Sequence, residues 1–427
     1  MDITPNEHGD WLNQRRDDFA TFRSISPKGE AESIFETSSP GFSTSRDARV
    51  LSFSKPTARQ NATRMIEAYE TARKAGVSAA DSTSAINWSA DLRRRFEKGR
   101  PLSRESLAMR SVTYRPFCRQ WLAHGEGIIE RPGSMLDQFS ASRANLAFTL
   151  LAPIDRTPFS TLMVQGPANL NLLMDAVHLF ARWRYVPVNP EDRMLIPDHG
   201  QDNAVDGYRR VDNITDESLA RFQDAYGDSF TKDDIFFYTY GLLHSPTYRE
   251  TYSADLKKSL ARVPLVADAA PLVEAGRTLS DWHLAYETVE PYPIDGLEAD
   301  PGATDPYAFF RVEKLKFAKV RDPATNKLVA DRSTIIYNER ITLSGIPEQA
   351  YRYMLGSRSA IEWIIDRYRV KPDNKDPELT NDPNNWSREV EDPRYIIDLL
   401  ARIVTVSPET MAIVDSLPAL DIRKNRG

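Results

Sequence analysis

Hydrophobic positions recur along the chain with two different periods, and the alternation between these periods predicts an α+β protein. Met65, Ile66 and Tyr69 recur at helical spacing and predict a helix that ends before Gly76. From Ser111 onward, aromatic and apolar runs are separated by turn residues, which is typical of β structure. Two of these runs, LAFTLLAP and FSTLMVQGP, are apolar at most positions and are expected to be buried strands.

The second half of the chain predicts helices on both sides of a β-hairpin. Thr231, followed by Asp233 and Asp234, has the composition of a helix start, and Pro246 is expected to interrupt that helix. The segments AFFRVEKLKFAKV and DRSTIIYNERITLSGIP, joined by the turn RDPATNK, predict the hairpin. Two more helices are expected, over residues 347–370 and from residue 393 to 407.

Composition narrows the class of protein. A chain of 427 residues is too long for one ordinary core, so two or three domains are expected. The net charge of −6 means that any contact with nucleic acid must rest on a local basic patch. The single cysteine, Cys118, excludes an intramolecular disulfide and a cysteine metal cluster. Because there is neither a spanning apolar run nor a signal pattern, we expect a cytoplasmic protein with no membrane partner.

Motifs that carry catalysis are largely missing. No Gly-Lys dipeptide occurs, which excludes a phosphate-binding P-loop, and G-x-G-x-x-G, H-E-x-x-H and G-x-S-x-G are absent as well. The Asn/Asp-Pro-Pro-Tyr loop of amino-methyltransferases is also absent. Asp198 and the tripeptide at Asp255 to Lys257 give only a weak nuclease-like pattern, because they lie far apart in sequence.

Several long segments, in the same order, resemble the C-terminal part of type ISP restriction-modification enzymes. They extend over about residues 2–415 and read DITPNEHGDWLNQR, GFSTSRDA, YRPFCRQWL, FYTYGLLHSPTYRETYSADLKKSLARVPLV, STIIYNERITLSGIPEQAYRYMLGSRSAIEWIIDRY and DPRYIIDLLARIVTVS. In those single-chain enzymes, a nuclease, a helicase motor and an adenine methyltransferase precede a target-recognition domain.

The resemblance implies a division of the chain and a set of partners. Residues 1–110 would be a connector leaving a methyltransferase domain, residues 111–345 the target-recognition domain, and residues 346–427 its helical C-terminal part. The implied fold is a mixed β-sheet and hairpin recognition domain with flanking helices. The implied partners are double-stranded DNA and a methyltransferase or helicase-nuclease domain or subunit.

The resemblance also implies what this chain lacks. Because the nuclease, motor and methyl-donor motifs are missing, we expect no cofactor here, and S-adenosylmethionine, ATP and Mg²⁺ only in the missing domains. The chain alone is therefore expected neither to methylate nor to cut DNA. It would position the target adenine for a methyltransferase domain that flips the base out of the stack.

Specific DNA binding needs phosphate anchors and groups that read base edges. In the predicted hairpin, Lys314 and Lys316 share one strand face and Leu315 the other, so the lysines would face a duplex. An ordinary amphipathic hairpin is the alternative. Arg46, in the turn FSTSRD, would contact a phosphate or a guanine edge, or would instead brace its loop. The candidate DNA-binding residues are Thr44, Arg46, Asp47, Arg115, Arg119, Tyr248, Arg249, Tyr252, Lys257, Lys314, Lys316 and Arg358.

Basic residues also gather in three clusters, each of which is either a phosphate anchor or a solvated helix face. The clusters are Arg93, Arg94, Arg95, Lys98, Arg100 and Arg104; Lys257, Lys258 and Arg262; and Arg352, Arg358, Arg367, Arg369 and Lys371.

The tyrosine-rich segment FFYTYGLLHSPTYRETY has two interpretations. Phe237, Tyr240 and His244 recur at helical spacing, which is typical of a stripe that packs into a core. Tyr248 and Tyr252 follow the proline and either contact DNA or pack as well. His244 has a hydroxyl neighbour but no acid partner within the motif, so catalysis by it is not favoured.

Two other functions stay open from the sequence. The chain would be a non-catalytic protein-interaction subunit that holds a methyltransferase or motor without reading DNA. Alternatively, it would be an independent hydrolase or nuclease that uses Asp198 and Asp255. DNA binding that weakens with added salt separates the recognition function from the interaction subunit.

Overall fold

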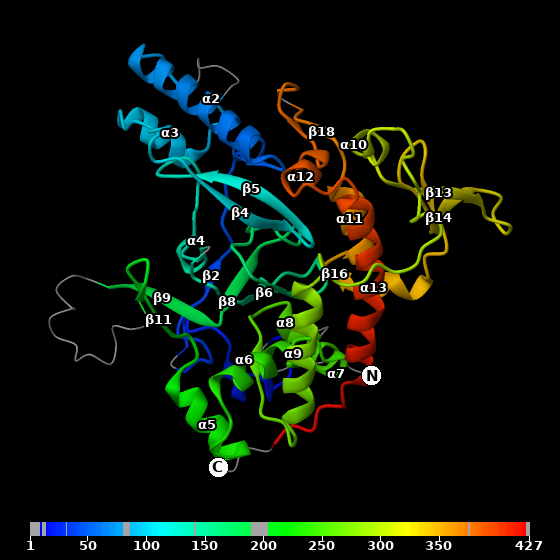
Figure 1. The fold of residues 1–427 in the computed structure, drawn as a ribbon. Coiled ribbons are helices and arrows are strands. Elements are labelled where there is room, and N and C mark those ends of the chain that lie inside the picture. Colours follow the sequence, from blue (N-terminus) through cyan, green and yellow to red (C-terminus); the bar gives the residue numbers. More distant parts are fainter. Residues whose placement is uncertain are drawn as a thin grey trace.

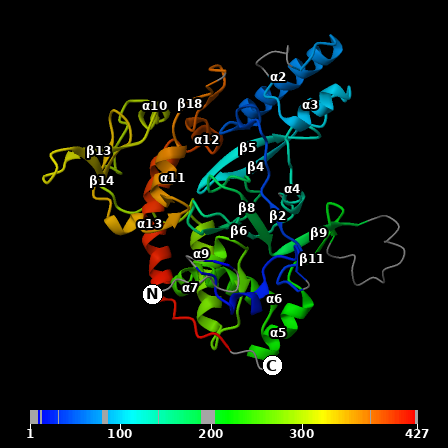
Figure 2. The same cartoon turned by 180° about the vertical axis from the view of Figure 1, so that it is seen from behind.

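The computed structural model describes residues 9–10, 14–30, 32–79, 86–140, 142–188, 204–374 and 376–423. Helices surround several small antiparallel sheets, which confirms the predicted α+β class (Figure 1). Figure 2 shows the same arrangement from behind, with one pair of strands projecting on each side. Within the described residues, no helix is both long enough and apolar enough to cross a membrane.

A four-stranded sheet lies at the centre, in the order β2 (Ser39–Pro40), β8 (Val177–Ala181), β6 (Ala147–Leu151) and β7 (Thr161–Val164). Every residue of β6 and β7 is buried, as the two apolar runs predicted. Alternate residues of β6 face two different hydrophobic cores, because successive strand side chains point to opposite sides. The sheet therefore separates the first core from the second.

The second core holds the tyrosine-rich segment and five helices. These are α5 (Asp216–Tyr226), α6 (Lys232–Leu242), α7 (Pro246–Thr251), α8 (Ser253–Leu256) and α9 (Ala270–Leu284). Thr231 and Asp234 form the capping box that starts α6, and Pro246 begins α7, so the predicted start and interruption are confirmed.

Helices α6 and α9 approach each other closely at two glycines. A Cβ atom at Gly241 would lie 2.1 Å from the carbonyl oxygen of Leu272, and one at Gly276 would lie 1.9 Å from that of Phe237. The two backbones are in direct contact, which only glycine permits.

A third core joins the N-terminal helices to a small sheet. Helices α2 (Lys55–Lys74) and α3 (Ala90–Glu97) pack near the sheet of β3 (Leu51–Ser52), β5 (Cys118–His124) and β4 (Ala108–Arg115). The helix predicted from Met65, Ile66 and Tyr69 is α2, and these three side chains are buried. Strand β4 crosses residue 110, so the sheet continues across the predicted boundary between connector and recognition domain.

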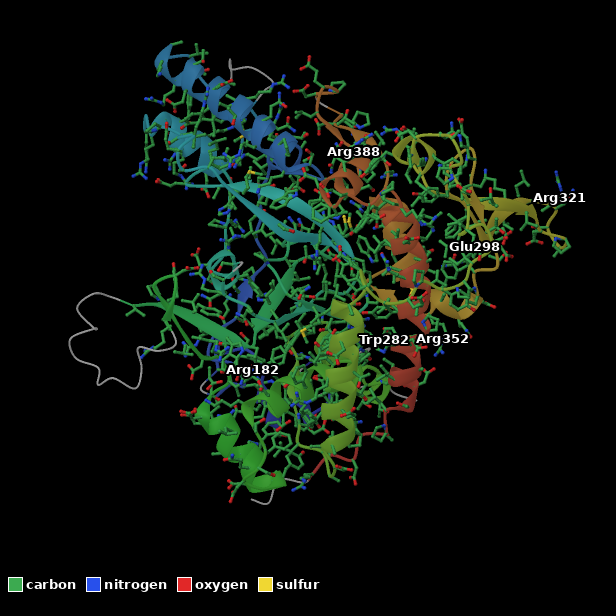
Figure 3. All side chains as sticks on the ribbon, in the orientation of Figure 1. Arg182, Trp282, Glu298, Arg321, Arg352 and Arg388 are labelled. Atoms are coloured by element: carbon green, nitrogen blue, oxygen red, sulfur yellow. The ribbon has the colours of Figure 1, made fainter. Side chains whose placement is uncertain are left out.

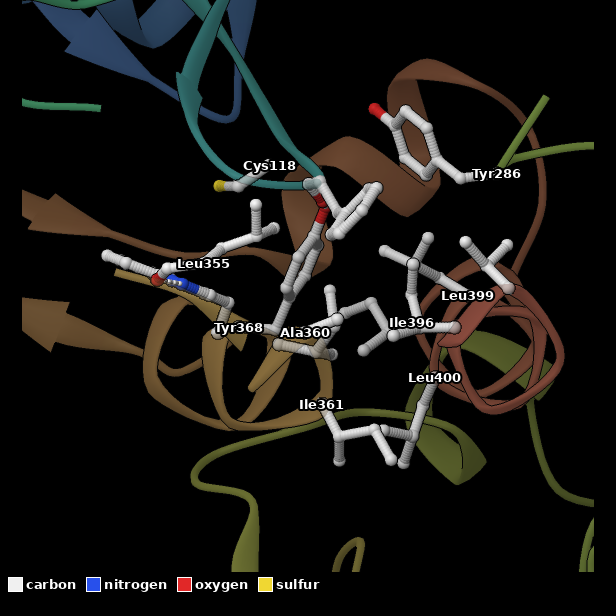
Figure 4. Packing of buried hydrophobic residues seen from close by; sticks show 14 of the residues in the cluster. Cys118, Tyr286, Leu355, Ala360, Ile361, Tyr368, Ile396, Leu399 and Leu400 are labelled. Carbon is white, nitrogen blue, oxygen red and sulfur yellow. Dashed lines mark hydrogen bonds between the residues drawn. The ribbon is translucent and has the colours of Figure 1, made fainter. Parts of the chain in front are cut away.

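The first core contains the C-terminal helices α11 (Ala360–Arg367), α12 (Asn384–Glu389) and α13 (Tyr395–Ser416). Figure 4 shows Ile396, Leu399 and Leu400 of α13 facing Ala360 and Ile361 of α11. Phe53, Phe117 and Cys118 from the N-terminal half belong to the same core. Residues from all three predicted segments thus share one hydrophobic interior.

The helix predicted over residues 347–370 is wrong in its first half. A 3-10 turn (Glu348–Tyr351) is followed by the short hairpin of β16 (Met354–Leu355) and β17 (Arg358–Ser359), and α11 begins only afterwards. Gly356 has a φ of +64°, a conformation that suits a two-residue hairpin turn and ends a helix. Ser359 and Glu362 then form a capping box that starts α11.

Two ribbons project from the body on opposite sides (Figures 1 and 2). One is the predicted hairpin, β13 (Lys316–Arg321) with β14 (Leu328–Ile336), extended by β15 (Thr342–Leu343). The other is β9 (Trp183–Pro187), paired with β11 (Tyr208–Asp212), which pairs in turn with β10 (Ala204–Val205). The remaining short elements are a 3-10 turn (Phe19–Thr21), β1 (Arg23–Ser24), α1 (Asp47–Val50), α4 (Met135–Gln138), β12 (Arg262–Val263), α10 (Pro306–Phe309), β18 (Lys371–Pro372) and β19 (Thr380–Asn381).

Candidate nucleic-acid interface

Thr44, Arg46 and Asp47 lie in a turn that is held in place by internal hydrogen bonds. Arg46 is 1% exposed, and its guanidinium donates to the carbonyl of Ile128 (2.8 Å) and to the hydroxyl of Ser89 (2.6 Å). Thr44 is buried and its hydroxyl donates to Asp47. Burial lowers the pKa of the Arg46 guanidinium. The structure therefore favours the bracing alternative for Arg46, because its donors already have acceptors inside the protein.

Arg115 and Arg119 are also held by neighbours. Arg115 is 6% exposed, and its Nη1 donates to the carbonyl of Tyr114 (2.6 Å) and to Oδ1 of Asn169 (3.0 Å). Arg119 is partly exposed and pairs with Glu287 at 3.2 Å. The loop-bracing alternative fits Arg115, while the contact of Arg119 with DNA stays a prediction.

The two tyrosines after Pro246 are core side chains. Tyr248 is 0% exposed and its hydroxyl donates to the carbonyl of Arg262 (2.7 Å). Tyr252 is 1% exposed and its hydroxyl donates to Asp18 (3.0 Å). The expectation that these rings contact DNA is corrected, because both rings fill the second core and both hydroxyls are bonded within it. Arg249 and Lys257, by contrast, line a common cavity.

His244, the candidate with a hydroxyl neighbour, is buried and neutral. Its Nδ1 lies 2.9 Å from the carbonyl oxygen of Tyr240, and burial holds its pKa well below the ordinary value. Of the weak nuclease pattern, Asp198 lies outside the described residues, and Asp255 is buried and accepts from the amide of Arg16 (3.2 Å). In the described part of the chain, no group of three or more His, Cys, Asp and Glu residues could hold a metal ion.

The β13–β14 hairpin has the predicted alternation at its start. Lys314 and Lys316 are exposed, Leu315 is 1% exposed, and Phe317 is partly buried. Farther along, Val320 and Leu328 are 49% and 60% exposed, and Arg321 lies toward the far end of the ribbon (Figure 3). The hairpin thus offers lysines and aliphatic side chains to solvent, and its contact with DNA stays a prediction.

Most members of the predicted basic clusters are neutralised by nearby carboxylates. Arg358, Arg367 and Arg369 all pair with Asp366, while Arg352 pairs with Asp415. In the first cluster, Arg94, Arg95 and Arg104 pair with Asp91, Glu126 and Glu67. Arg93, Lys98 and Arg100 are exposed and have no carboxylate partner among the described residues. These three cations at α3 are therefore available to an outside anion.

The second projecting ribbon, residues 183–188 and 204–212, is here called the arginine arm. Arg209 and Arg210 are exposed and have no carboxylate partner in the part of the chain that the structure describes. The register pairs Arg209 with Val186 and Val211 with Arg184, so these four residues share one face. On the other face the Arg210 guanidinium lies 4.5 Å from the centre of the Trp183 ring.

The arginine arm is anchored firmly to the body. Arg182, at its base, is 5% exposed, pairs with Asp212 (2.7 Å) and Asp233, and stacks on the Trp183 ring at 3.7 Å. Gln138 of α4 exchanges two hydrogen bonds with the backbone of Tyr185, of 2.6 and 3.2 Å. The sequence did not reveal this arm, although the segment ARWRYV alternates arginine with aromatic residues and GYRRVD places two arginines between a tyrosine and a valine.

Helix α3 and the arginine arm lie on the same side of the molecule, with α4 between them (Figures 1 and 2). A cavity of about 590 Å³ lies between α3 and α4. Its lining includes the basic residues Arg94, Lys98 and Arg100 and also the carboxylates of Asp91, Glu126, Glu130 and Asp137. We call this side of the molecule the α3–arm face. Its exposed cations without a carboxylate partner among the described residues are Arg93, Lys98, Arg100 and, on the two opposite faces of the arm, Arg209 and Arg210. Exposed cations without partners, beside apolar and aromatic side chains, can bind a polyanion.

The chain is similar to known DNA-acting enzymes along most of its length. A family model, the type ISP C-terminal specificity domain, matches residues 33–399. The type ISP enzyme LlaBIII bound to DNA has a TM-score of 0.81 and 31% identity, covering 99% of this chain and 26% of that one. A nuclease-deletion mutant of the type ISP enzyme LlaGI, in complex with a DNA substrate mimic, has a TM-score of 0.77 and 30% identity, covering 99% of this chain and 36% of that one.

A third solved structure, the DrdV–DNA complex, has a TM-score of 0.78 and 26% identity, covering 98% of this chain and 40% of that one. The chain therefore spans less than half the length of each of these proteins. No curated protein matches it.

Proposed function

The chain belongs to the type ISP C-terminal specificity domain family, and on this premise we propose that it is the double-stranded DNA recognition module of a restriction-modification enzyme. The three solved structures named above were determined with DNA or with a DNA mimic. The module would select the site on the duplex at which a methyltransferase domain acts on adenine.

The observation that carries this proposal is the α3–arm face. Five exposed arginine and lysine side chains on one side of the molecule have no carboxylate partner in the described residues. Of the predicted basic clusters, the third is largely paired with carboxylates. Exposed cations without a carboxylate partner among the described residues also occur on the β13–β14 hairpin, for example Lys316, Lys319 and Arg321. Phosphate neutralisation by such cations supplies most of the sequence-independent affinity for DNA.

A second candidate surface is the β13–β14 hairpin. Lys314 and Lys316 are exposed there, as the sequence predicted, and a two-stranded ribbon fits a major groove about 12 Å wide. The hairpin projects from the side opposite the arginine arm, so it would contact a different segment of DNA (Figure 1).

The proposal assigns bond-making to other domains or to a partner subunit. Methyl transfer, ATP hydrolysis and cleavage would need S-adenosylmethionine, ATP and Mg²⁺ bound there, and the module would work in the cytoplasm, where the DNA is. Consumption of S-adenosylmethionine or hydrolysis of ATP by the pure chain would contradict the assignment of catalysis to other domains.

The test is a titration of the pure chain with duplex DNA at several salt concentrations. The logarithm of the binding constant is expected to fall linearly with the logarithm of the salt concentration. The slope should be about −0.9 for each phosphate contact. Absence of binding at low salt, both alone and with a methyltransferase partner present, would favour the interaction subunit instead. If the chain is a protein-interaction subunit, it should bind the methyltransferase partner equally well with and without DNA.

A further inference from the structure

A cavity of about 600 Å³ lies between the loop that joins β6 to β7 and the helices α7 and α8. Its lining combines apolar side chains, among them Ile154, Phe159 and Leu256, with polar ones that include the carboxylates of Asp155 and Glu250. Three cations, Arg156, Arg249 and Lys257, line it as well. An apolar hollow with a few convergent charged groups is typical of a ligand site.

Arg249 is the cation that the protein itself does not neutralise. Its side chain is half-buried, and its Nε donates to the carbonyl of Leu243 at 2.6 Å. The guanidinium lies 5.5 Å from the centre of the Phe159 ring, and no carboxylate pairs with it among the described residues. Burial lowers its pKa to about 10, which reflects the free-energy cost of holding a charge away from water.

The other two cations are paired with carboxylates: Lys257 in an exposed pair, and Arg156 with Asp175, whose side chain is 7% exposed. Lys257 pairs with Asp155 at 3.1 Å, where the two side chains are 41% and 81% exposed. Arg156 is largely exposed and pairs with Asp175. Exposed ion pairs of this kind contribute little, so Lys257 can exchange Asp155 for an anion in the cavity at small cost.

We propose that this cavity binds a phosphate group, held by the terminal nitrogens of Arg249 inside the cavity and by Lys257 at its rim. A guanidinium has its donors in a fork that matches two oxygens of a phosphate, and the bound anion would compensate the buried charge. The phosphate comes either from the backbone of DNA or from a small molecule. The first source rests on the proposed function, whereas the second does not.

The first measurement uses inorganic phosphate and the intact chain. The melting temperature is followed as phosphate replaces chloride at constant ionic strength, because a ligand that binds only the folded state raises it. We expect a rise for the wild type, no rise for Arg249→Gln, and a reduced rise for Lys257→Gln. Lys258→Gln is the matched control, because Lys258 is an exposed neighbour that does not line the cavity.

These variants separate binding from a structural role of Arg249. If Arg249 only holds the end of α6, Arg249→Gln lowers the melting temperature equally at every phosphate concentration and the response to phosphate persists. If Arg249→Gln does not fold, the rise in melting temperature with phosphate is compared between Lys257→Gln and Lys258→Gln. A smaller rise for Lys257→Gln supports the site. Equal responses of these two variants, or no response of the wild type, would overturn a free-phosphate site.

The second measurement uses a short duplex and identifies the source. If the DNA backbone supplies the phosphate, Lys257→Gln weakens DNA binding several-fold and reduces the salt slope by about 1. Lys28→Gln, at an exposed lysine that neither lines the cavity nor belongs to a basic cluster, has neither effect. A response to inorganic phosphate with unchanged DNA binding assigns the site to a small phosphate compound. A wild type that binds phosphate but no DNA would refute the proposed function and leave this site standing. Failure of both measurements would remove the site.

Discussion

Arg46 and Glu130 form an ion pair inside the third core, with 3.3 Å between Nη2 and Oε2 and with side chains 1% and 12% exposed. The same guanidinium nitrogen donates to the hydroxyl of Ser89, which starts α3 as its N-cap. One arginine therefore connects the turn before α1, the start of α3 and the loop after β5. The position of the start of α3 relative to the loop after β5 depends on this connection.

Replacing Arg46 by Gln is expected to lower the free energy of unfolding by about 3–5 kcal/mol, because Glu130 loses its partner while it stays largely buried. Urea denaturation measures the loss. The control is Arg94→Gln, which breaks a pair whose side chains are 63% and 54% exposed and should cost at most about 1 kcal/mol. A folded Arg46→Gln protein of normal stability with altered sequence preference would show instead that Arg46 reads a base.

The contact between α6 and α9 predicts an unusual sensitivity to one methyl group. Gly276→Ala would place a Cβ atom 1.9 Å from the carbonyl oxygen of Phe237, so the helices must move apart. We expect the free energy of unfolding, measured by urea denaturation, to fall by about 1–3 kcal/mol. Gly166→Ala is the control, because no atom lies within 4 Å of its added Cβ. Equal stability of the two variants would mean that the helices separate at no cost.

The sequence predicted elements wherever local rules decide the structure. The cap at Thr231, the interruption at Pro246 and the alternation around Leu315 depend on neighbours a few residues away, and all three are present. The helix over residues 347–370 failed because Gly356 adopts a positive φ in a hairpin turn, which a helical pattern of apolar residues does not reveal.

The candidate site was harder to predict, because exposure and pairing depend on distant parts of the chain. Arg46 meets Glu130 across 84 residues, and Tyr252 meets Asp18 across 234. A basic residue therefore looks the same in the sequence whether it is free or neutralised. Arg209 and Arg210 became candidates only when the structure showed them exposed on a ribbon, with no carboxylate partner among the described residues.

The buried histidines predict a loss of stability in acid. Burial lowers the pKa of His283 to about 3, and its Nδ1 and Nε2 lie 2.6 Å from Tyr240 Oη and 3.2 Å from Thr410 Oγ1. In the unfolded chain the histidine pKa is about 6.5, so the unfolded state binds a proton first as the pH falls. His283 therefore stabilises the fold fully above about pH 6.5, and this contribution is lost progressively toward pH 3.

His283 alone is expected to lower the free energy of unfolding by about 2 kcal/mol when the pH falls from 7 to 5. Denaturation at both pH values should show the loss in the wild type and a loss smaller by that amount in His283→Gln. Thr410→Val removes the partner of Nε2 but keeps the titrating ring, so it should lower stability at both pH values while retaining the pH dependence. Identical pH dependence of wild type and His283→Gln would contradict the assignment.

The hairpin lysines test the second proposed DNA surface. Lys314→Ala and Lys316→Ala are expected to weaken binding to all duplex sequences alike, because exposed lysines contact phosphates rather than base edges. Each variant should reduce the salt slope by about 0.9. Lys28→Ala, an exposed lysine outside the hairpin, is the control. Affinity unchanged at low salt would restrict the contact to the α3–arm face.

The arginine arm gives the sharpest test of where DNA lies. Arg209→Gln and Arg210→Gln remove exposed charges without breaking any ion pair in the described residues, so the fold should keep its melting temperature. Each change is expected to weaken DNA binding and to reduce the salt slope by about 1, and the double variant by about 2. Arg59→Gln, on the exposed side of α2, serves as the charge-matched control. If the double variant binds DNA with the wild-type slope while Arg59→Gln also has no effect, the phosphates lie elsewhere, and the α3–arm face is not the DNA surface.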